Sequence, residues 1–137
     1  MSPPRGWIGV DLDGTLAHYE KWVHAGHVGA PVSKMVARVK GWLEDGWEVR
    51  VFTARIYPIN DVIHPGDILR FQPADDRERE AVTALRAVQD WCLAHVGRVL
   101  PVTNVKDYGM VELWDDRCVQ VQPNKGEPVG ASTRGLK

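Results

Sequence analysis

Several classes of protein are excluded by what this sequence lacks. It contains two cysteines in 137 residues, Cys92 and Cys118, which are too few for a disulfide framework, and neither has a neighbour at zinc-site spacing. No apolar run approaches the roughly 18 residues of a membrane span, and the opening segment is polar. The 17 Lys and Arg residues are balanced by 18 Asp and Glu, which excludes a broad basic surface for nucleic acid or lipid. We expect a cytoplasmic protein without a membrane partner.

The length and the composition are typical of one globular domain. With 44% hydrophobic and 26% charged residues, the chain can bury a core of its own and has no room for a second domain. Apolar periodicity stops near residue 122, and Pro, Gly, Ser and Lys are frequent beyond it. We therefore predict a folded domain over residues 1–122 and a flexible tail over residues 123–137.

Apolar patterns predict alternating strands and helices. Short runs of β-forming residues predict four strands and a short fifth, at residues 7–10, 47–52, 99–103, 110–114 and 118–121. Apolar positions at helical spacing predict helices over residues 33–45, with Ser33 as N-cap, and over residues 76–96. Residues 56–75 match neither pattern. The alternation predicts an α/β fold, a single Rossmann-like domain whose mostly parallel sheet has helices on both faces.

Acidic residues follow two of the predicted strands. Asp11 and Asp13 come directly after the first strand, and Asp115 and Asp116 follow the fourth. Because ligands bind outside the carboxyl ends of the strands in open α/β sheets, these carboxylates should meet in one cleft. There they repel one another by several kcal/mol unless a cation neutralises them. An all-oxygen set without His or Cys selects a hard ion, and Mg²⁺ is the small octahedral ion that shares its ligands with a phosphate.

The other two predicted strands are followed by residues that suit a bound phosphoryl group. Thr53 ends the second strand, and Lys106 follows the third after a short connection. A hydroxyl donor and a cation can hold the phosphoryl oxygens that a metal ion leaves free. We also expect Ala54 and Arg55 to line the substrate site, and we leave open whether Arg55 contacts the substrate or an acidic neighbour.

Taken together, these residues resemble a known set of motifs. Asp-Leu-Asp-Gly-Thr-Leu at residues 11–16, then Thr53, Lys106 and the acidic pair Asp115 and Asp116, resemble the four motifs of the haloacid dehalogenase (HAD) superfamily of phosphohydrolases. The resemblance covers most of the chain and implies a HAD-like catalytic domain. It further implies a Mg²⁺-dependent phosphatase that hydrolyses a phosphomonoester through an aspartyl-phosphate intermediate.

The resemblance also implies a role for each matching residue. Asp11 is the expected nucleophile, and Asp13 the expected general acid that protonates the leaving oxygen and then helps to activate water. Thr53 and Lys106 are expected to bind the phosphoryl oxygens. The implied ligands of Mg²⁺ are the backbone carbonyl of Asp13 and the side chains of Asp11, Asp115 and Asp116.

The segments between the predicted elements are too short for the large cap domain that many HAD members carry. We therefore expect a capless domain with an open cleft, rimmed by residues 17–31 and 56–75 because these segments follow the first two strands. The expected partner is a phosphorylated substrate, either a small molecule, a nucleotide or a polynucleotide end. The sequence leaves open the oligomeric state, the role of residues 56–75, and whether Asp115 or Asp116 contacts the metal directly.

Two non-catalytic alternatives use similar residues. A phosphoacceptor of the response-regulator type also has acidic residues, a Thr and a Lys on a small parallel sheet. Its acceptor Asp follows the third strand, however, where this chain has Thr103 and Asn104. A phosphate-binding module that kept the fold and lost turnover is the other alternative.

Overall fold

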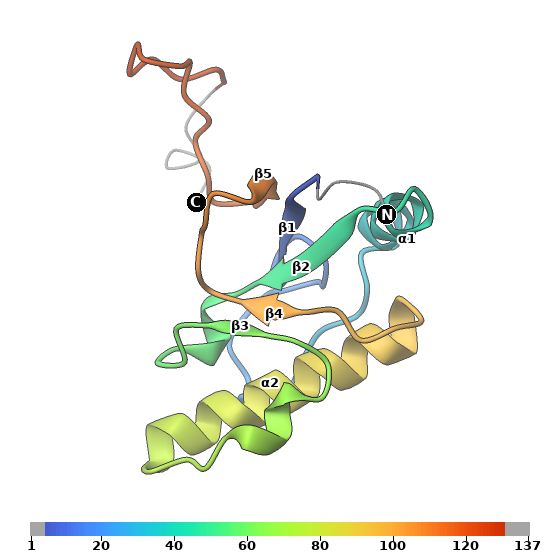
Figure 1. The fold of residues 1–137 in the computed structure, drawn as a ribbon, viewed down its shortest axis with the longest axis vertical. Coiled ribbons are helices and arrows are strands. Elements are labelled where there is room, and N and C mark those ends of the chain that lie inside the picture. Colours follow the sequence, from blue (N-terminus) through green and yellow to red (C-terminus); the bar gives the residue numbers. More distant parts are fainter. Residues whose placement is uncertain (1–4, 131–137) are drawn as a thin grey trace.

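One five-stranded sheet organises the structure. The computed structural model describes residues 5–130, and its strands lie in the order β3-β4-β2-β1-β5 (Figure 1). Neighbouring strands run parallel except β3, which is antiparallel to β4. The prediction of a small α/β domain with a mostly parallel sheet is therefore confirmed. The strands span Trp7–Asp11 (β1), Glu48–Phe52 (β2), Val62–Ile63 (β3), Val102–Thr103 (β4) and Met110–Trp114 (β5).

Two α-helices connect the parallel strands. Helix α1, Ser33–Glu44, joins β1 to β2, and α2, Asp76–His95, lies between β3 and β4. The side chain of Asp75 caps α2 by accepting a hydrogen bond from the backbone N–H of Glu78 at 2.8 Å, which satisfies one of the free donors of the first turn. The predicted cap of α1 is wrong, because Val32 holds the N-cap position and offers no side-chain bond.

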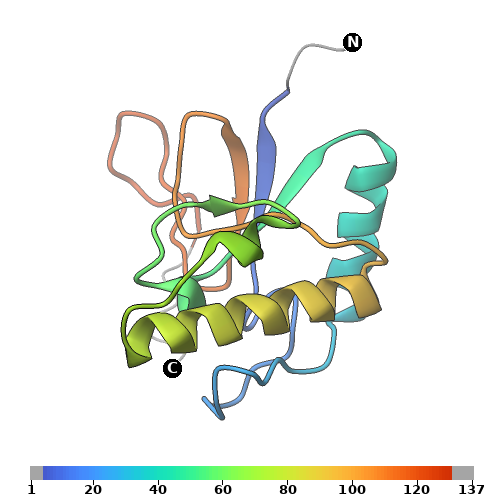
Figure 2. The ribbon, with the colours of Figure 1, turned by 60° about the horizontal axis from the view of Figure 1, so that its bottom comes forward.

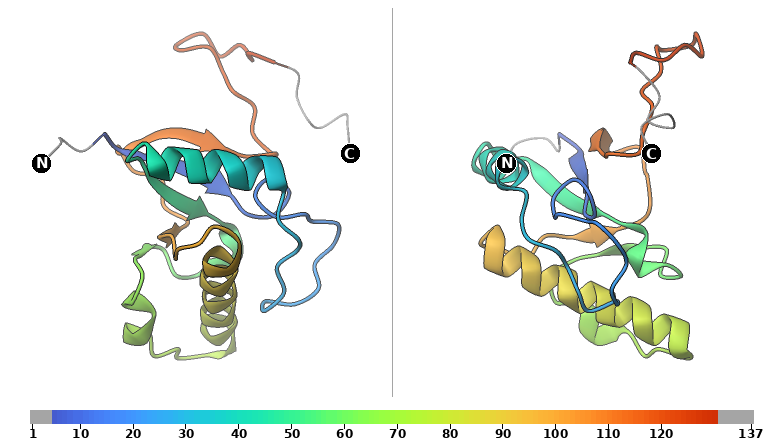
Figure 3. Two further views of the ribbon diagram at one scale, coloured as in Figure 1. Left: turned by 90° about the vertical axis from the view of Figure 1, so that its right-hand side faces the viewer. Right: turned by 180° about the vertical axis from the view of Figure 1, so that it is seen from behind.

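Both α-helices lie on the same face of the sheet (Figures 1 and 3). Paired residues of parallel strands point to the same side, so Val10, Val51, Val102 and Trp114 form one row across the sheet. The ring of Trp114 packs 5.1 Å from that of Trp42 on α1, and the three valines belong to the same buried core as residues of both helices. Burial of this row against the helices accounts for the main hydrophobic core.

The opposite face of the sheet has no helix in the described part of the chain. Trp7 on this face is 2% exposed because the Arg50 guanidinium covers its ring at 4.4 Å and its indole N–H donates to Asp107 at 2.8 Å. That bond and the backbone N–H of Gly109 lower the pKa of Asp107. The expected helices on both faces are therefore not confirmed. The connection from β4 to β5 is only residues 104–109, which is too short for a helix.

Smaller features differ from the predictions. Residues 56–75 were expected to lack regular structure, but they contain β3 and a 3-10 helix at Asp67–Arg70. The expected strand over 99–103 is reduced to β4 alone, and 118–121 contributes only a bridge from Val121 to Pro128. Part of the predicted tail, residues 123–130, forms the exposed turn closed by that bridge, and residues 131–137 lie outside the described residues. No helix within residues 5–130 is both long and apolar enough to cross a membrane.

Candidate functional site

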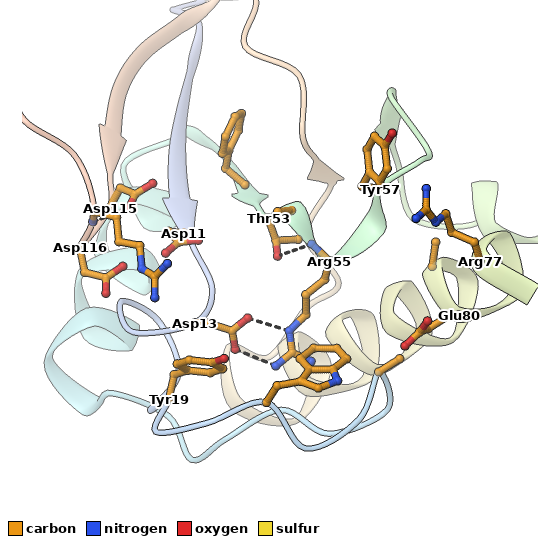
Figure 4. Close-up of a pocket in the computed structure, with 16 residues that line it drawn as sticks. Asp11, Asp13, Tyr19, Thr53, Arg55, Tyr57, Arg77, Glu80, Asp115 and Asp116 are labelled. Carbon is orange, nitrogen blue, oxygen red and sulfur yellow. Dashed lines mark hydrogen bonds and ion pairs between the residues drawn. The ribbon is translucent and has the colours of Figure 1, made fainter. Parts of the chain in front are cut away.

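The carboxyl ends of the strands form the floor of a cavity of about 620 Å³ (Figure 4). Asp11 ends β1, Thr53 follows β2, and Asp115 and Asp116 follow β5. The segment 17–31 forms one wall, as expected for a rim of the cleft, and it is held to α2 where the indole N–H of Trp91 donates to the carbonyl of Gly29 at 2.8 Å. In Figure 2 this blue segment extends beyond the sheet, next to α2.

Three carboxylates meet on one side of the cavity. Oxygen atoms of Asp11, Asp115 and Asp116 all lie within 4.8 Å of one another. Burial, the negative charges of Asp115 and Asp116, and a hydrogen bond with the Asp116 side chain together raise the pKa of Asp11 to about 7. No cation of the protein pairs with this trio among the described residues. The trio therefore carries an electrostatic cost that a bound cation would remove.

The geometry of the trio fits a small divalent ion. Mg²⁺ binds oxygen at about 2.1 Å, so ligand atoms on opposite sides of the ion lie about 4.2 Å apart. The separations within the trio are compatible with that span. All ligand atoms are carboxylate oxygens, which favour a hard ion over zinc or copper. Of the four predicted metal ligands, three side chains come together here, and Asp13 was expected to contribute only its backbone carbonyl.

Gly14 lets Asp116 approach the loop that follows Asp11. The φ of Gly14 is +87°, a left-handed conformation that side chains rarely adopt, and a Cβ atom there would lie 2.4 Å from Oδ2 of Asp116. Any larger residue would therefore push Asp116 away from Asp11. Glycine at this position thus permits a tight turn and the close approach of a carboxylate of the same site.

Asp13 points away from the acidic trio and toward Arg55 (Figure 4). Its two oxygens accept hydrogen bonds from Nε and NH2 of Arg55, each at 2.7 Å. The Arg55 side chain is 7% exposed, that of Asp13 is 22% exposed, and NH1 of Arg55 donates to the carbonyl of His27 at 2.5 Å. The sequence left open whether Arg55 contacts the substrate or an acidic neighbour. In the structure Arg55 lines the cavity and contacts an acidic neighbour, Asp13.

Thr53 stands at the floor of the cavity with a free donor. It is 2% exposed, and its Oγ1 accepts a hydrogen bond from the backbone N–H of Arg55 at 3.2 Å. A hydroxyl that accepts one hydrogen bond keeps its own O–H to donate, so Thr53 can donate a hydrogen bond to an oxygen atom in the cavity. Ala54 lines the cavity beside it, as predicted.

Lys106 is not where the sequence predicts. It is exposed and does not line the cavity. It belongs to the connection 104–109, which leaves the carboxyl edge of the sheet and returns to the other end of β1, where Asp107 is bound by Trp7. Anchoring at Asp107 therefore holds this segment along the open face of the sheet. Arg117, which lies next to Asp116 in the chain, does line the cavity and brings a positive charge to it.

Several residues of the cavity wall were not predicted, or were weighed only as surface residues. Trp22 packs on the Arg55 guanidinium at 5.0 Å, and the Arg77 guanidinium lies 5.7 Å from the ring of Tyr57. The sequence signal was weak, because α2 follows a long irregular segment and nothing local shows that its first turns face the strand ends. Trp22 and Ala25 belong to the predicted rim over residues 17–31, and the lining residues outside the predicted segments are Phe52, Arg77, Glu80 and Ala81.

Comparisons with known proteins add no assignment to this geometry. No protein-family model, curated protein or solved structure matches the chain.

Proposed function

We propose that this protein is a Mg²⁺-dependent phosphatase that hydrolyses a phosphomonoester through an aspartyl-phosphate on Asp11. The observation that carries the proposal is the trio of Asp11, Asp115 and Asp116 at the carboxyl ends of parallel strands, with their oxygens within 4.8 Å. A partly exposed trio of carboxylates without a protein cation is still costly, and it is useful when a metal ion and an anionic substrate meet there. The HAD-like motif order supports the same assignment, and with it a Rossmann-like domain in a cytoplasmic protein.

The first half of the proposed reaction uses Asp11, Asp13 and Thr53. A carboxylate oxygen of Asp11 attacks phosphorus, the bond from phosphorus to the leaving oxygen breaks, and Asp13 donates a proton to that oxygen. The Thr53 hydroxyl donates to a phosphoryl oxygen. The chemistry that Mg²⁺ supplies when bound is neutralisation of the carboxylates and of the phosphoryl charge. Asp11, Asp115 and Asp116 are the side chains that would hold the ion.

The second half regenerates the protein. Asp13 takes a proton from a water molecule, whose oxygen attacks phosphorus, and the bond between phosphorus and Asp11 breaks. Inorganic phosphate leaves, Asp11 is again a carboxylate, and Asp13 holds the proton that it donates in the next cycle. Asp11 and Asp13 have different neighbours, which suits one carboxylate to act as nucleophile and the other to act as acid and base.

Steady-state hydrolysis of p-nitrophenyl phosphate tests the proposal. We expect nitrophenol release with Mg²⁺ and none after EDTA, with activity restored by excess Mg²⁺. Undiminished turnover in EDTA would contradict the role of the metal ion. A panel of sugar phosphates, nucleotides and phosphorylated oligonucleotides then identifies the physiological leaving group, since the cavity of about 620 Å³ is large enough for a nucleotide.

The non-catalytic alternatives give different results in the same assay. A phosphoacceptor forms one equivalent of phosphorylated protein from a small phosphodonor and stops, whereas a phosphate-binding module forms none. Asp11 ends β1, Asp115 and Asp116 follow β5, and Thr103 ends β4, and this placement favours the phosphatase over the response-regulator type.

A further inference from the structure

Two parallel hydrogen bonds, together called the fork, join the Arg55 guanidinium to the Asp13 carboxylate, and the Arg55 side chain is largely shielded from solvent. Both N–H···O distances are 2.7 Å, and the Arg55 side chain is 7% exposed. Paired parallel bonds from a planar guanidinium fix the rotation of a carboxylate as well as its position. A carboxylate has about four acceptor sites, so the fork leaves lone pairs of Asp13 free to accept a proton from water.

Arg55 is itself fixed by two other groups. Its NH1 donates to the carbonyl of His27, and its guanidinium lies against the ring of Trp22. Its backbone N–H donates to Thr53 Oγ1 at the end of β2. The side chain that orients Asp13 is thus anchored to the sheet at one end and to the segment 17–31 at the other.

We propose that Arg55 is a positioning residue that orients Asp13 for the water-activating half of the reaction. This inference rests on the proposed function. In that half-reaction a mobile water must meet phosphorus and a proton acceptor at once, so the direction of the Asp13 carboxylate controls the rate. In the first half, an activated leaving group such as p-nitrophenolate departs without a proton and does not need Asp13.

The two half-reactions are separated by their kinetic constants. For p-nitrophenyl phosphate, kcat/KM reports attack by Asp11, and kcat reports hydrolysis of the aspartyl-phosphate when that step is slow. Loss of the fork should lower kcat and spare kcat/KM, so KM falls together with kcat. The aspartyl-phosphate then accumulates and the first turnover appears as a burst of nitrophenol.

The test compares Arg55→Met and Arg55→Lys with wild type, with folding of each variant checked by circular dichroism. For Arg55→Met we expect kcat to fall about tenfold to a hundredfold, with kcat/KM within about threefold of wild type and a burst of about one nitrophenol per protein. Lysine keeps the charge and loses the fork, so Arg55→Lys should show the same split with a smaller loss of kcat. If Arg55→Met fails to fold, Arg55→Lys decides.

Two controls separate orientation of Asp13 from general damage. Arg79→Met removes an exposed ion pair with Asp76 on α2, neither of which lines the cavity, and should leave both constants unchanged. Trp22→Leu removes only one of the groups that hold the Arg55 guanidinium and keeps Arg55 itself, so we expect a smaller fall in kcat and a smaller burst than in Arg55→Met. A burst in Trp22→Leu equal to that of Arg55→Met would assign the effect to the segment 17–31 and overturn the proposal.

The remaining outcomes distinguish this proposal from the proposed function. Equal losses of kcat and kcat/KM in both Arg55 variants, without a burst, overturn the role of Arg55 and leave the phosphatase intact. Failure of wild type to release nitrophenol with Mg²⁺ overturns the proposed function, and the role of Arg55 with it.

Discussion

Asp11 and Asp13 are two residues apart in the chain, yet their carboxylates have opposite surroundings. Asp11 lies among two other carboxylates, and burial together with their charges raises its pKa to about 7. Asp13 lies against the Arg55 guanidinium, with both oxygens bonded at 2.7 Å. The end of β1 thus places the Asp13 carboxylate beside a positive charge of the protein. It places the Asp11 carboxylate beside two further negative charges.

The difference shows which part of the site is complete without a ligand. The pair of Asp13 and Arg55 satisfies its own charges and can remain formed in the free protein. The trio around Asp11 has no protein cation beside it among the described residues, so a proton on Asp11 or a bound cation would relieve its repulsion. We therefore expect Mg²⁺ to act at Asp11, Asp115 and Asp116, and expect changes at Asp13 to alter proton transfer with little effect on metal binding.

The largest effect is expected from removing the proposed nucleophile, Asp11. Asp11→Asn keeps the size of the side chain but cannot attack phosphorus, so p-nitrophenyl phosphate turnover should fall by at least about 10³-fold. The variant should keep its fold by circular dichroism. Wild-type turnover in Asp11→Asn would show that another residue is the nucleophile.

A smaller effect, dependent on the substrate, is expected from Asp13→Asn. An amide cannot donate the proton that an alkoxide leaving group needs, so kcat/KM for an alkyl phosphate should fall about 10²-fold to 10⁴-fold. The value for p-nitrophenyl phosphate should change far less, because p-nitrophenolate leaves unaided. Equal losses of kcat/KM on the two substrates would contradict the role of Asp13 as the acid.

Much of the fold and the acidic part of the site could be predicted because both follow from local patterns. Strand ends at Asp11 and Trp114 are marked by apolar runs that stop at carboxylates, and parallel strands bring their carboxyl ends together. The single helical layer could not be predicted in this way. It depends on the short 104–109 connection, which crosses the open face because Trp7 binds Asp107.

The positions of the cavity cations also required the structure. Lys106 has the expected place in the sequence but lies outside the cavity, whereas Arg55 turns toward Asp13 because His27 and Trp22 hold its guanidinium. Side-chain direction at a strand end depends on partners distant in sequence, 42 residues away for Asp13 and Arg55. Residue spacing alone carries no information about such partners.

Substitutions in the segment 56–75 test whether a residue that lines the cavity affects substrate binding more than an exposed residue of the same segment does. Tyr57 lines the cavity, whereas Arg70 pairs with Asp61 on the exposed side of the same segment. Tyr57→Ala should raise KM for a good physiological substrate by roughly threefold to tenfold and leave kcat for p-nitrophenyl phosphate unchanged, because the contact is with the leaving group. Arg70→Ala is the matched control and should change neither. A larger KM effect in Arg70→Ala would place substrate selection on the outer side of the segment.

The smallest expected effect concerns stability and pH in the metal-free protein. The pKa of Asp11 is about 7 in the folded state against an ordinary value of 3.8. Between these values the folded state keeps a proton that the unfolded state has lost, so the contribution of Asp11 to the free energy of unfolding falls as pH rises and is constant above about pH 7. Groups with a lowered pKa, such as Asp107, give the opposite slope, so one protein alone does not isolate Asp11.

The difference in the free energy of unfolding between wild type and Asp11→Asn isolates the contribution of Asp11. Urea unfolding in EDTA at about pH 5 and about pH 8 should show the variant gaining stability relative to wild type at the higher pH. Because Asp11 is partly exposed, solvent screening reduces this gain to about 1 kcal/mol. Saturating Mg²⁺ should reverse the order, since it stabilises wild type at the higher pH by binding the ionised trio in the folded state. A pH-independent difference would mean that the pKa of Asp11 is not raised in the folded protein.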